Sequence, residues 1–188
     1  MLGQEAERGT ERAARAPSQV ALHIAPSRDL AALSAVARAS FLESFAHLIP
    51  WADIRARADT EDSPDGIGAY LAAGATAWLA SHPATGAPVG WALLCAPELP
   101  EIKTRPTDRE LKRIYLLAPF RGGGAGAALL AAVETRARAD GAGRLLLGVH
   151  HANPAVAWYT RRGFEKVGER RFRVGTSHFH DVILVKPL

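Results

Sequence analysis

Six consecutive residues, Arg121-Gly-Gly-Gly-Ala-Gly126, form a loop that could bind an anion. Glycines leave the backbone N–H groups accessible, and a helix that begins within the loop would direct the positive end of its dipole to the same place. Arg121 adds a fixed positive charge. The loop therefore predicts a phosphate site, and the structural alternative is a glycine-rich turn that lets a strand and a helix pack closely.

Two common phosphate-binding folds do not fit this loop. A P-loop NTPase requires Lys followed by Ser or Thr after the last glycine, whereas Ala127 and Ala128 stand there. A dinucleotide-binding fold could use Gly122, Gly124 and Ala127, but it also needs an acidic residue about 20 positions later. Residues 145–150 contain no acid, so both classes are disfavoured.

A second group of residues follows one helix and one strand later. It begins with Asn153 before Pro154, continues through a short helix that carries Tyr159, and ends with Gly163-Phe164. Taken alone, Asn before Pro is a routine helix cap, and an aromatic residue on a short helix usually belongs to the core. The two groups acquire a functional meaning in combination.

In combination they resemble the GNAT N-acetyltransferases. Arg121, Gly124 and Gly126 fill the signature Q/R-x-x-G-x-G/A, and residues 153–164 are similar to the second motif of that family at its usual spacing. The resemblance covers about residues 20–188. It implies an α/β fold, the GNAT acyl-CoA N-acyltransferase fold, with a mixed, mostly antiparallel central sheet of about seven strands flanked by about four helices.

The same resemblance implies acetyl-CoA as the co-substrate, with no metal. The backbone N–H groups of the glycine loop would hold the pyrophosphate, and the preceding strand would pair with the pantetheine amides as if the cofactor were an added strand. Asn153, at the N-terminus of the predicted helix 153–161, would form a hydrogen bond with the pantetheine arm. The residues expected to bind acetyl-CoA are Tyr115, Leu116, Leu117, Arg121, Gly122, Gly123, Gly124, Ala125, Gly126, Asn153 and Ala155.

Acetyl transfer by direct attack in a ternary complex needs a group that removes a proton from the amine. An alkylammonium with a pKa of about 10.4 is neutral in only about one molecule in 10³ at pH 7. Glu110, near the start of the strand that leads into the loop, is the expected base, directly or through a water. The resemblance assigns Tyr159 as the acid that protonates the departing thiolate, and a backbone N–H near Leu116 as the group that holds the oxyanion.

Acidic residues near the join of the first two predicted helices favour a cationic acceptor, although a solvated acidic loop would have the same composition. Residues 41–45, 110–115 and 172–188 also resemble the bacterial polyamine N-acetyltransferase branch. The sequence departs from that branch at Gly123, where lysine is frequent, and at Ala118-Pro119, where Pro-Glu is usual. The residues expected to face the acceptor are Glu43, Trp51, Asp59, Glu61 and Asp62.

The predicted function is transfer of an acetyl group from acetyl-CoA to a primary amine, with small amines or polyamines favoured. A protein N-terminus, a lysine side chain or an aminoglycoside is the alternative acceptor, and a non-catalytic CoA-binding sensor is the alternative function. Nucleic acid is not an expected partner, because the arginines are not interleaved with aromatic residues in a stacking platform. A monomer and a homodimer are both compatible with the sequence.

Apolar periodicity and turn residues predict the elements that position these residues. Pro50 stops the first helix, and Ser63-Pro64 begins the second as a cap followed by a first-turn proline. The predicted helices are 29–47, 63–73, 125–139 and 153–161. The predicted strands are 20–24, 75–80, 89–95, 109–117, 144–149, 164–174 and 179–185.

Length and composition fit one domain over residues 19–188, preceded by a flexible tail over residues 1–18. The 188 residues are 48% hydrophobic and 22% charged, and the sequence has no run of roughly 20 consecutive apolar residues, the length of a membrane span. The N-terminal residues carry both charge signs without an apolar core, and Cys95 is the one cysteine. Both features predict a cytoplasmic location.

Basic residues concentrate in the second half of the chain. From residue 100 onward there are 16 Lys or Arg and 8 Asp or Glu, whereas the first 99 residues hold 7 and 11. The basic half is expected to match an anionic cofactor, and the acidic half a cationic acceptor.

Four histidines stand in two groups, His150-His151 and His178-x-His180. The alternation of a strand would place His178 and His180 on one face, a geometry that permits joint metal ligation. No cysteine cluster or third fixed ligand accompanies them, so we predict no metal site.

Overall fold

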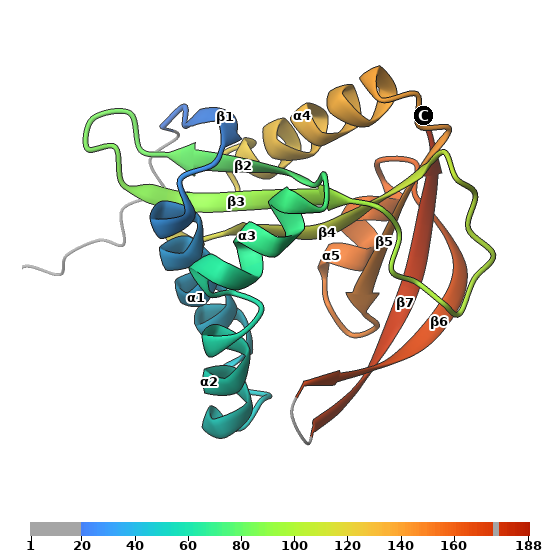
Figure 1. Ribbon diagram of the computed structural model, residues 1–188, viewed down its shortest axis with the longest axis horizontal. Helices are drawn as coiled ribbons and strands as arrows, with labels where there is room; N and C mark the ends of the chain where they lie inside the picture. Colours follow the sequence, from blue (N-terminus) through green and yellow to red (C-terminus); the bar gives the residue numbers. More distant parts are fainter. Residues whose placement is uncertain (1–19, 175–176) are drawn as a thin grey trace, which may run out of the picture.

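A seven-stranded sheet runs through residues 20–174 and 177–188, the parts of the chain that the computed structural model describes (Figure 1). The predicted tail, residues 1–18, lies outside the described residues. The strand order is β1-β2-β3-β4-β5-β7-β6. The strands are β1 (His23–Ser27), β2 (Thr76–Ser81), β3 (Pro88–Cys95), β4 (Asp108–Leu116), β5 (Arg144–His150), β6 (Glu165–Val174) and β7 (Ser177–Pro187). The predicted sheet of about seven strands is confirmed.

The described residues form one helix more than the sequence pattern predicted. The helices are α1 (Leu30–Phe45), α2 (Trp51–Asp59), α3 (Pro64–Ala72), α4 (Ala125–Ala139) and α5 (Ala155–Thr160), with a short 3-10 helix, η1 (Ala118–Phe120), before the glycine loop. The prediction of about four helices missed α2. Its buried residues are Asp53, Ile54 and Arg57, and two charged residues on the buried face hide the apolar periodicity that marks a helix.

The first strand also differs from the prediction. β1 begins at His23, three residues after the predicted start, and continues through Pro26 and Ser27, beyond the predicted end at residue 24. β1 is an edge strand, where the missing N–H of a proline is tolerated. The helix start itself is confirmed, because the Asp29 side chain accepts a hydrogen bond from the Ala32 N–H at 3.0 Å and caps α1.

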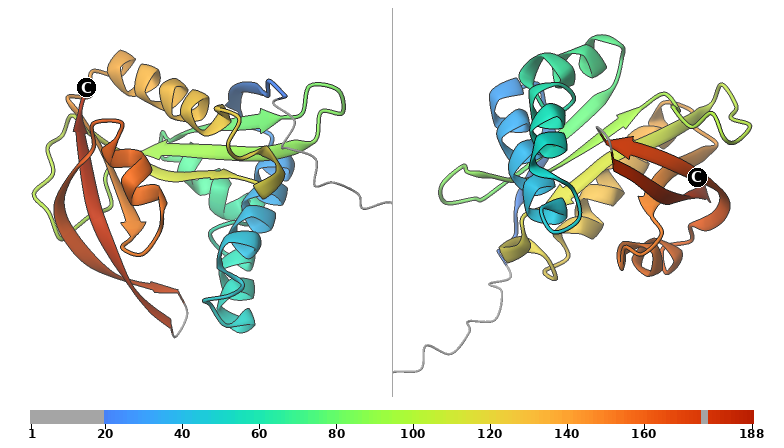
Figure 2. Two further views of the ribbon diagram at one scale, coloured as in Figure 1. Left: turned by 180° about the vertical axis from the view of Figure 1, so that it is seen from behind. Right: turned by 90° about the horizontal axis from the view of Figure 1, so that it is seen from below.

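Helices cover both faces of the sheet (Figures 1 and 2). Along β3 the side chains alternate, so Ala92 belongs to the core under α4 and α5, whereas Trp91 belongs to the core under α1 and α3. Leu129 of α4 and Leu33 of α1 are both fully buried in these cores. No helix in the described part of the chain is long and apolar enough to cross a membrane.

All neighbouring strands pair antiparallel except β4 and β5, which pair in parallel over only three residues. Residues 108–110 lie opposite residues 144–146, and beyond this contact β4 continues with β3 while β5 continues with β7. The second halves of the two strands therefore diverge. This split leaves one edge of β4 unpaired inside the sheet.

A buried ion pair fastens the base of this split. Asp108 is 0% exposed and accepts two hydrogen bonds from the Arg144 guanidinium, at 2.6 and 3.0 Å, and one from the Arg105 N–H at 2.7 Å. Burial alone would raise the pKa of the Asp108 carboxyl, but these hydrogen bonds hold it below its ordinary value. The pair therefore stabilises the folded state when Asp108 is ionised.

We expect Arg144→Ala to lower the free energy of unfolding by about 3 kcal/mol at pH 7, because the substitution leaves a buried carboxylate without its partner. A depressed carboxyl pKa contributes stability above the unfolded pKa of about 3.9, and this is lost as pH falls through the folded pKa. The difference between wild type and variant should therefore shrink below about pH 4.

Urea unfolding at pH 7 and at acid pH measures this difference. Arg136→Ala is the matched control, because Arg136 and Asp140 form an exposed pair worth less than about 1 kcal/mol. A loss for Arg144→Ala that is equally small, or that does not change with pH, would contradict a stabilising role of the buried pair.

Candidate active site

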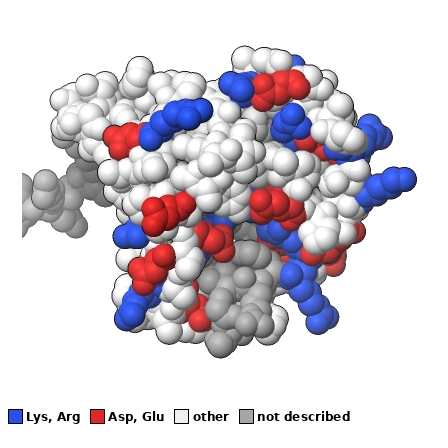
Figure 3. All heavy atoms as spheres, in the orientation of Figure 1, with Lys and Arg blue, Asp and Glu red and all other residues white. Residues whose placement is uncertain are grey.

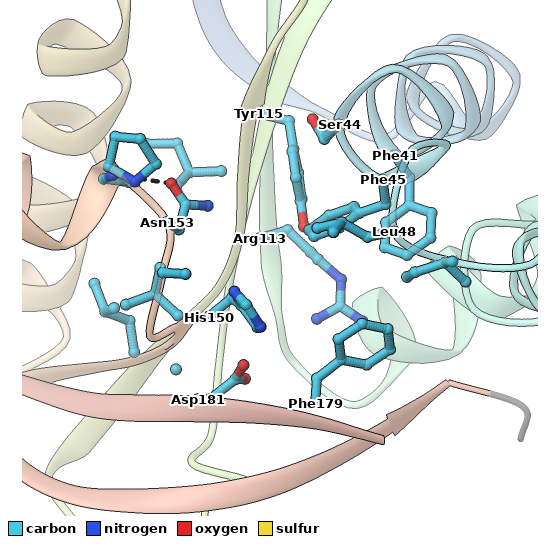
Figure 4. Close-up of a pocket in the computed structure, with 18 of the residues that line it drawn as sticks. Phe41, Ser44, Phe45, Leu48, Arg113, Tyr115, His150, Asn153, Phe179 and Asp181 are labelled. Carbon is cyan, nitrogen blue, oxygen red and sulfur yellow. Dashed lines mark hydrogen bonds between the residues drawn. The ribbon is translucent and has the colours of Figure 1, made fainter. Parts of the chain in front are cut away.

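A cavity of about 680 Å³ lies where β4 and β5 diverge (Figure 4). This volume is typical of small-molecule sites. The walls come from α1, β4, β5, α5, β6 and β7, so residues far apart in the sequence meet there. The predicted site residues that line it are Glu43, Tyr115, Leu116, Arg121, Asn153, Ala155 and Tyr159.

Tyr159 reaches the cavity from α5 and is only 6% exposed. Trp158 and Phe164 contact its ring nearly edge-on, at centroid distances of 5.0 and 5.4 Å, and hold its orientation. Burial, and then the nearby Tyr115, raises the pKa of the Tyr159 hydroxyl. Tyr159 is therefore a protonated hydroxyl at the cavity wall across the neutral pH range.

The glycine loop adjoins the cavity at the end of β4, although only Arg121 of the loop lines it. Gly122 and Gly124 have φ angles of 85° and 86°, a left-handed conformation that favours glycine. Gly124 is the N-cap of α4 and offers no side-chain hydrogen bond. The N–H groups of the first turn of α4 are thus available to an anion.

Glu43 ties α1 to the start of this loop. Its carboxylate accepts a hydrogen bond from the Ala118 N–H at 3.0 Å and pairs with the Arg121 guanidinium. Arg121 Nε also donates to the Leu116 carbonyl at 2.8 Å. Glu43 lines the cavity, but these contacts indicate that it holds the loop rather than an acceptor.

Asn153 both caps a helix and lines the cavity. Its Oδ1 accepts a hydrogen bond from the Ala155 N–H at 2.8 Å, which is the dashed line in Figure 4. The amide nitrogen has no protein acceptor among the described residues, so it can still donate to a ligand. Leu117 does not line the cavity, and its N–H donates to the Val89 carbonyl at 2.9 Å.

Glu110 occupies the last position where β4 pairs with β5, opposite Leu146. Its carboxylate is 1% exposed, accepts a hydrogen bond from the Glu98 N–H at 2.6 Å and lies 3.4 Å from Lys112 Nζ. It is not among the residues that line the cavity. The Glu110 carboxylate is therefore enclosed by protein and does not contact the cavity directly.

Two of the acids expected to face the acceptor are bound to arginines instead. Asp62 is 2% exposed and accepts from Arg57 Nε at 3.0 Å, while Glu61 bridges Arg57 and Arg113. Burial alone would lower the pKa of Arg57, but Asp62 and Glu61 raise it. Neither acid lines the cavity, because their charges attach α2 and the segment after it to β4.

Trp51 and Asp59 do not face the cavity either. Trp51 is 64% exposed, and Asp59 forms an exposed ion pair with Arg55. Both residues border a separate hollow of about 400 Å³ formed by α2 alone. These two residues thus lie on the unpredicted helix α2 and do not line the cavity between β4 and β5.

His150 and Asp181 also line the cavity, although no catalytic or binding role was predicted for them. His150 and Asp181 lie directly opposite each other on β5 and β7, and Asp181 accepts from Arg170 at 3.1 Å. Burial, and then the neighbouring His151, lowers the pKa of His150. The histidine pair was visible in the sequence, but its position beside Asp181 depends on the register of two strands that lie about 30 residues apart.

Metal ligation is a separate question for these histidines. Within residues 20–174 and 177–188, no group of three or more His, Cys, Asp or Glu side chains is arranged to hold a metal ion. His180 instead contacts Glu169, at 2.7 Å from Nε2 to the carboxylate.

Comparison with known families adds an independent observation. The model of the acetyltransferase (GNAT) family matches residues 37–164, from within α1 to the residue before β6. The chain belongs to the GNAT acetyltransferase family. Both predicted motifs lie inside the match, whereas Arg170, Phe179 and Asp181 lie beyond it.

Curated relatives of this GNAT chain include uncharacterized N-acetyltransferases from Mycobacterium bovis and Mycobacterium tuberculosis. Each is 39% identical to it over 101 residues, which are 53% of this chain and 60% of the relative. The chain thus matches less than two thirds of the length of these relatives.

Solved structures share the fold over most of the chain. The PaiA N-acetyltransferase from Thermoplasma acidophilum, in complex with coenzyme A, has a TM-score of 0.70 at 21% identity and covers 89% of this chain and 99% of its own. The ribosomal-protein-alanine N-acetyltransferase from Brucella melitensis has a TM-score of 0.65 at 23% identity, with coverages of 89% and 100%. These likenesses establish that the GNAT fold extends through β6 and β7, beyond the family match.

Asp62→Ala is expected to destabilise this GNAT chain by about 3 kcal/mol, because it leaves the Arg57 guanidinium buried without its main partner. Asp59→Ala is the matched control and should change the free energy of unfolding by less than about 0.5 kcal/mol, because Asp59 is exposed. Urea unfolding of both variants at pH 7 measures the difference. If both variants lost equally little stability, the Asp62–Arg57 pair would not stabilise the fold, and Asp62 would behave as a solvated loop residue.

Proposed function

We propose that the chain transfers an acetyl group from acetyl-CoA to a primary amine in a ternary complex. One observation carries the proposal, namely that an uncapped, glycine-led helix start and a buried, protonated Tyr159 adjoin the same cavity. The helix start can bind the phosphates of a nucleotide cofactor. The Tyr159 hydroxyl can donate a proton to a thiolate leaving group. Membership of the GNAT family supports the combination.

The residues around the glycine loop fit the anionic part of acetyl-CoA. The first-turn N–H groups of α4 would hold the pyrophosphate, because Gly122, Gly123 and Gly124 place no side chain over them. Ala125 and Gly126 continue this cradle into the helix. Arg121 is held near the cavity by Glu43 and contributes positive charge beside the loop. The solved relative that contains coenzyme A is consistent with this assignment.

The split between β4 and β5 fits the pantetheine arm. Tyr115 and Leu116 present a strand edge that β5 does not occupy, and a ligand amide can pair with such an edge as an added strand. Leu117 is less suited to this pairing, because its N–H donates to the Val89 carbonyl and its carbonyl accepts the Phe120 N–H, both at 2.9 Å. On the opposite wall of the cavity, Asn153 Nδ2 and the start of α5 at Ala155 would bind the same pantetheine arm.

Proton transfers follow from the two titratable groups already described. Tyr159 keeps its proton at neutral pH and would donate it to the sulfur as the thiolate departs. Glu110, behind the cavity wall, would accept the proton of the amine through a water. The acetyl group serves as the electrophile, and the chain's part is to align it with the amine.

The acceptor is assigned here only as a primary amine. The polyamine prediction rested on a resemblance of residues 41–45, 110–115 and 172–188 to the polyamine branch and on acidic residues near the first two predicted helices. Of these acids, Asp59, Glu61 and Asp62 are engaged in ion pairs with arginines. A multiply charged acceptor therefore loses the support of these acids. A primary amine of any type still satisfies the proposed chemistry.

Incubation of the protein with acetyl-CoA and a panel of amines, with detection of free CoA, tests the proposal. Tyr159→Phe should lower kcat by about 10²-fold or more, the usual contribution of a general acid, with little change in the Kd for CoA. Tight CoA binding without release on any amine would contradict catalysis and favour a CoA sensor. Unchanged turnover in Tyr159→Phe would remove Tyr159 from the mechanism.

Gly124→Ala should weaken CoA binding by about tenfold, about 1.4 kcal/mol, because a Cβ at a φ of 86° strains the loop that presents the N–H groups. Gly74→Ala is the matched control. Gly74 has a φ of 91° with open space around it, so it carries the same backbone strain at the turn before β2. Calorimetric titration with CoA compares the variants, and equal Kd values for both would place the anion site elsewhere.

A further inference from the structure

The side of the cavity next to α1, its apolar side, is rich in aromatic and aliphatic residues, although Arg57, Arg113 and Ser44 also line it (Figure 4). Asn153 and His150 lie toward α5 and β5, whereas Phe41, Phe45 and Leu48 lie on the opposite side with Phe179 of β7. The proposed cofactor groups occupy the side next to α5 and β5. The apolar side is therefore the part of the cavity left for an acceptor.

The apolar side is a hydrophobic cluster of its own. Phe41, Ile49 and Ile54 are buried there, and Phe45 and Phe179 pack against them, separate from the two cores on the faces of the sheet. The Phe41 and Phe45 rings lie 4.7 Å apart. Most of this cluster is needed for packing, but Phe45, Leu48 and Phe179 also line the cavity and keep part of their surface free.

Charges around this side are matched within the protein. Arg113 pairs with Glu61, and Arg170 pairs with Asp181. The acids that line the cavity are Glu43 and Asp181, and each is bound by an arginine. On the face of the molecule drawn in Figure 3, acidic and basic side chains are likewise interspersed. A ligand with several positive charges finds no unpaired carboxylate on the described walls, so it gains little from entering.

One polar group stands where the two sides meet. The His150 ring lies 6.0 Å from the Phe179 ring and beside His151, with Asp181 opposite it on β7. A neutral imidazole can accept one hydrogen bond, which suits a single amino group. The cavity thus offers one place for nitrogen and an aromatic wall for the group that carries it.

We infer that the acceptor is a primary amine on an apolar, ring-containing body, with the ring against Phe45, Leu48 and Phe179 and the amino group toward His150. This inference rests on the proposed acetyl transfer and specifies its substrate class. Ring-to-ring contact and removal of apolar surface from water supply the binding energy, and a single charge limits the cost of leaving water.

A four-member amine panel tests the inference on the full-length protein, by CoA release from acetyl-CoA. The panel is 2-phenylethylamine, n-butylamine, spermidine and a short peptide with a free N-terminal alanine. We expect kcat/KM for 2-phenylethylamine to exceed that for spermidine and for n-butylamine by at least about tenfold, since even one methylene in an apolar pocket changes specificity by about 10- to 200-fold.

Two variants locate the effect in the cavity. Leu48→Ala, at a half-exposed position, should lower kcat/KM for 2-phenylethylamine by about fivefold to tenfold, and by less for n-butylamine, which has no ring to place against this wall. Phe45→Ala should have a larger effect of the same kind. Leu42→Ala is the matched control, because Leu42 is similarly exposed on α1 but does not line the cavity.

The outcomes separate the inference from the proposed function. Release of CoA with spermidine or the peptide in preference to 2-phenylethylamine overturns the inference and leaves acetyl transfer intact. The same holds if Leu48→Ala lowers activity equally on all amines, or on none. Failure of every amine to release CoA, in a protein that binds CoA, overturns the proposed function and the inference together.

Discussion

The brief parallel contact between β4 and β5 is the constraint on which the site depends. Only residues 108–110 of β4 pair with β5, and the buried Asp108–Arg144 pair fixes that contact at its base. Beyond it each strand follows its other neighbour. The separation opens a cavity with two strand walls and leaves an unpaired edge on β4, and a continuous sheet would provide neither. The glycine loop and α5 then stand at the ends of the diverging strands because each directly follows one of them.

Ion pairs between the two halves of the chain organise the walls of this cavity. The acidic first half supplies Glu43 and Glu61, and the basic second half supplies Arg121 and Arg113 as their partners. Part of the charge asymmetry of the sequence is thus neutralised within the fold, although both glutamates keep part of their surface in solvent, so each pair positions side chains more than it stabilises the fold. What remains for an acceptor is an aromatic wall with balanced charge, which changes the expected substrate from a polycation to a singly charged amine.

Much of the fold was predictable because most elements carry local signals. α4 follows the predicted bounds, since an apolar stripe runs between two glycine-containing turns, and the seven strands follow from alternation and turn residues. α2 was missed for a physical reason. Its buried face carries Asp53 and Arg57, and Arg57 is buried because Glu61 and Asp62, just beyond the helix, pair with it. An apolar-periodicity pattern does not register charged residues on a buried face.

The sequence by itself determined the family, the anion-binding loop and the tyrosine, because these depend on residue types at fixed short spacings. Gly124 and Tyr159 belong to that class. The tertiary structure alone decided which charges are free and which residues face the acceptor. His150 and Asp181 meet only through the register of β5 and β7, and Asp62 leaves the candidate site only because Arg57 folds onto it. The first outcome depends on strand pairing across about 30 residues, and the second on the backbone conformation after α2 that brings Asp62 back onto Arg57; composition alone encodes neither.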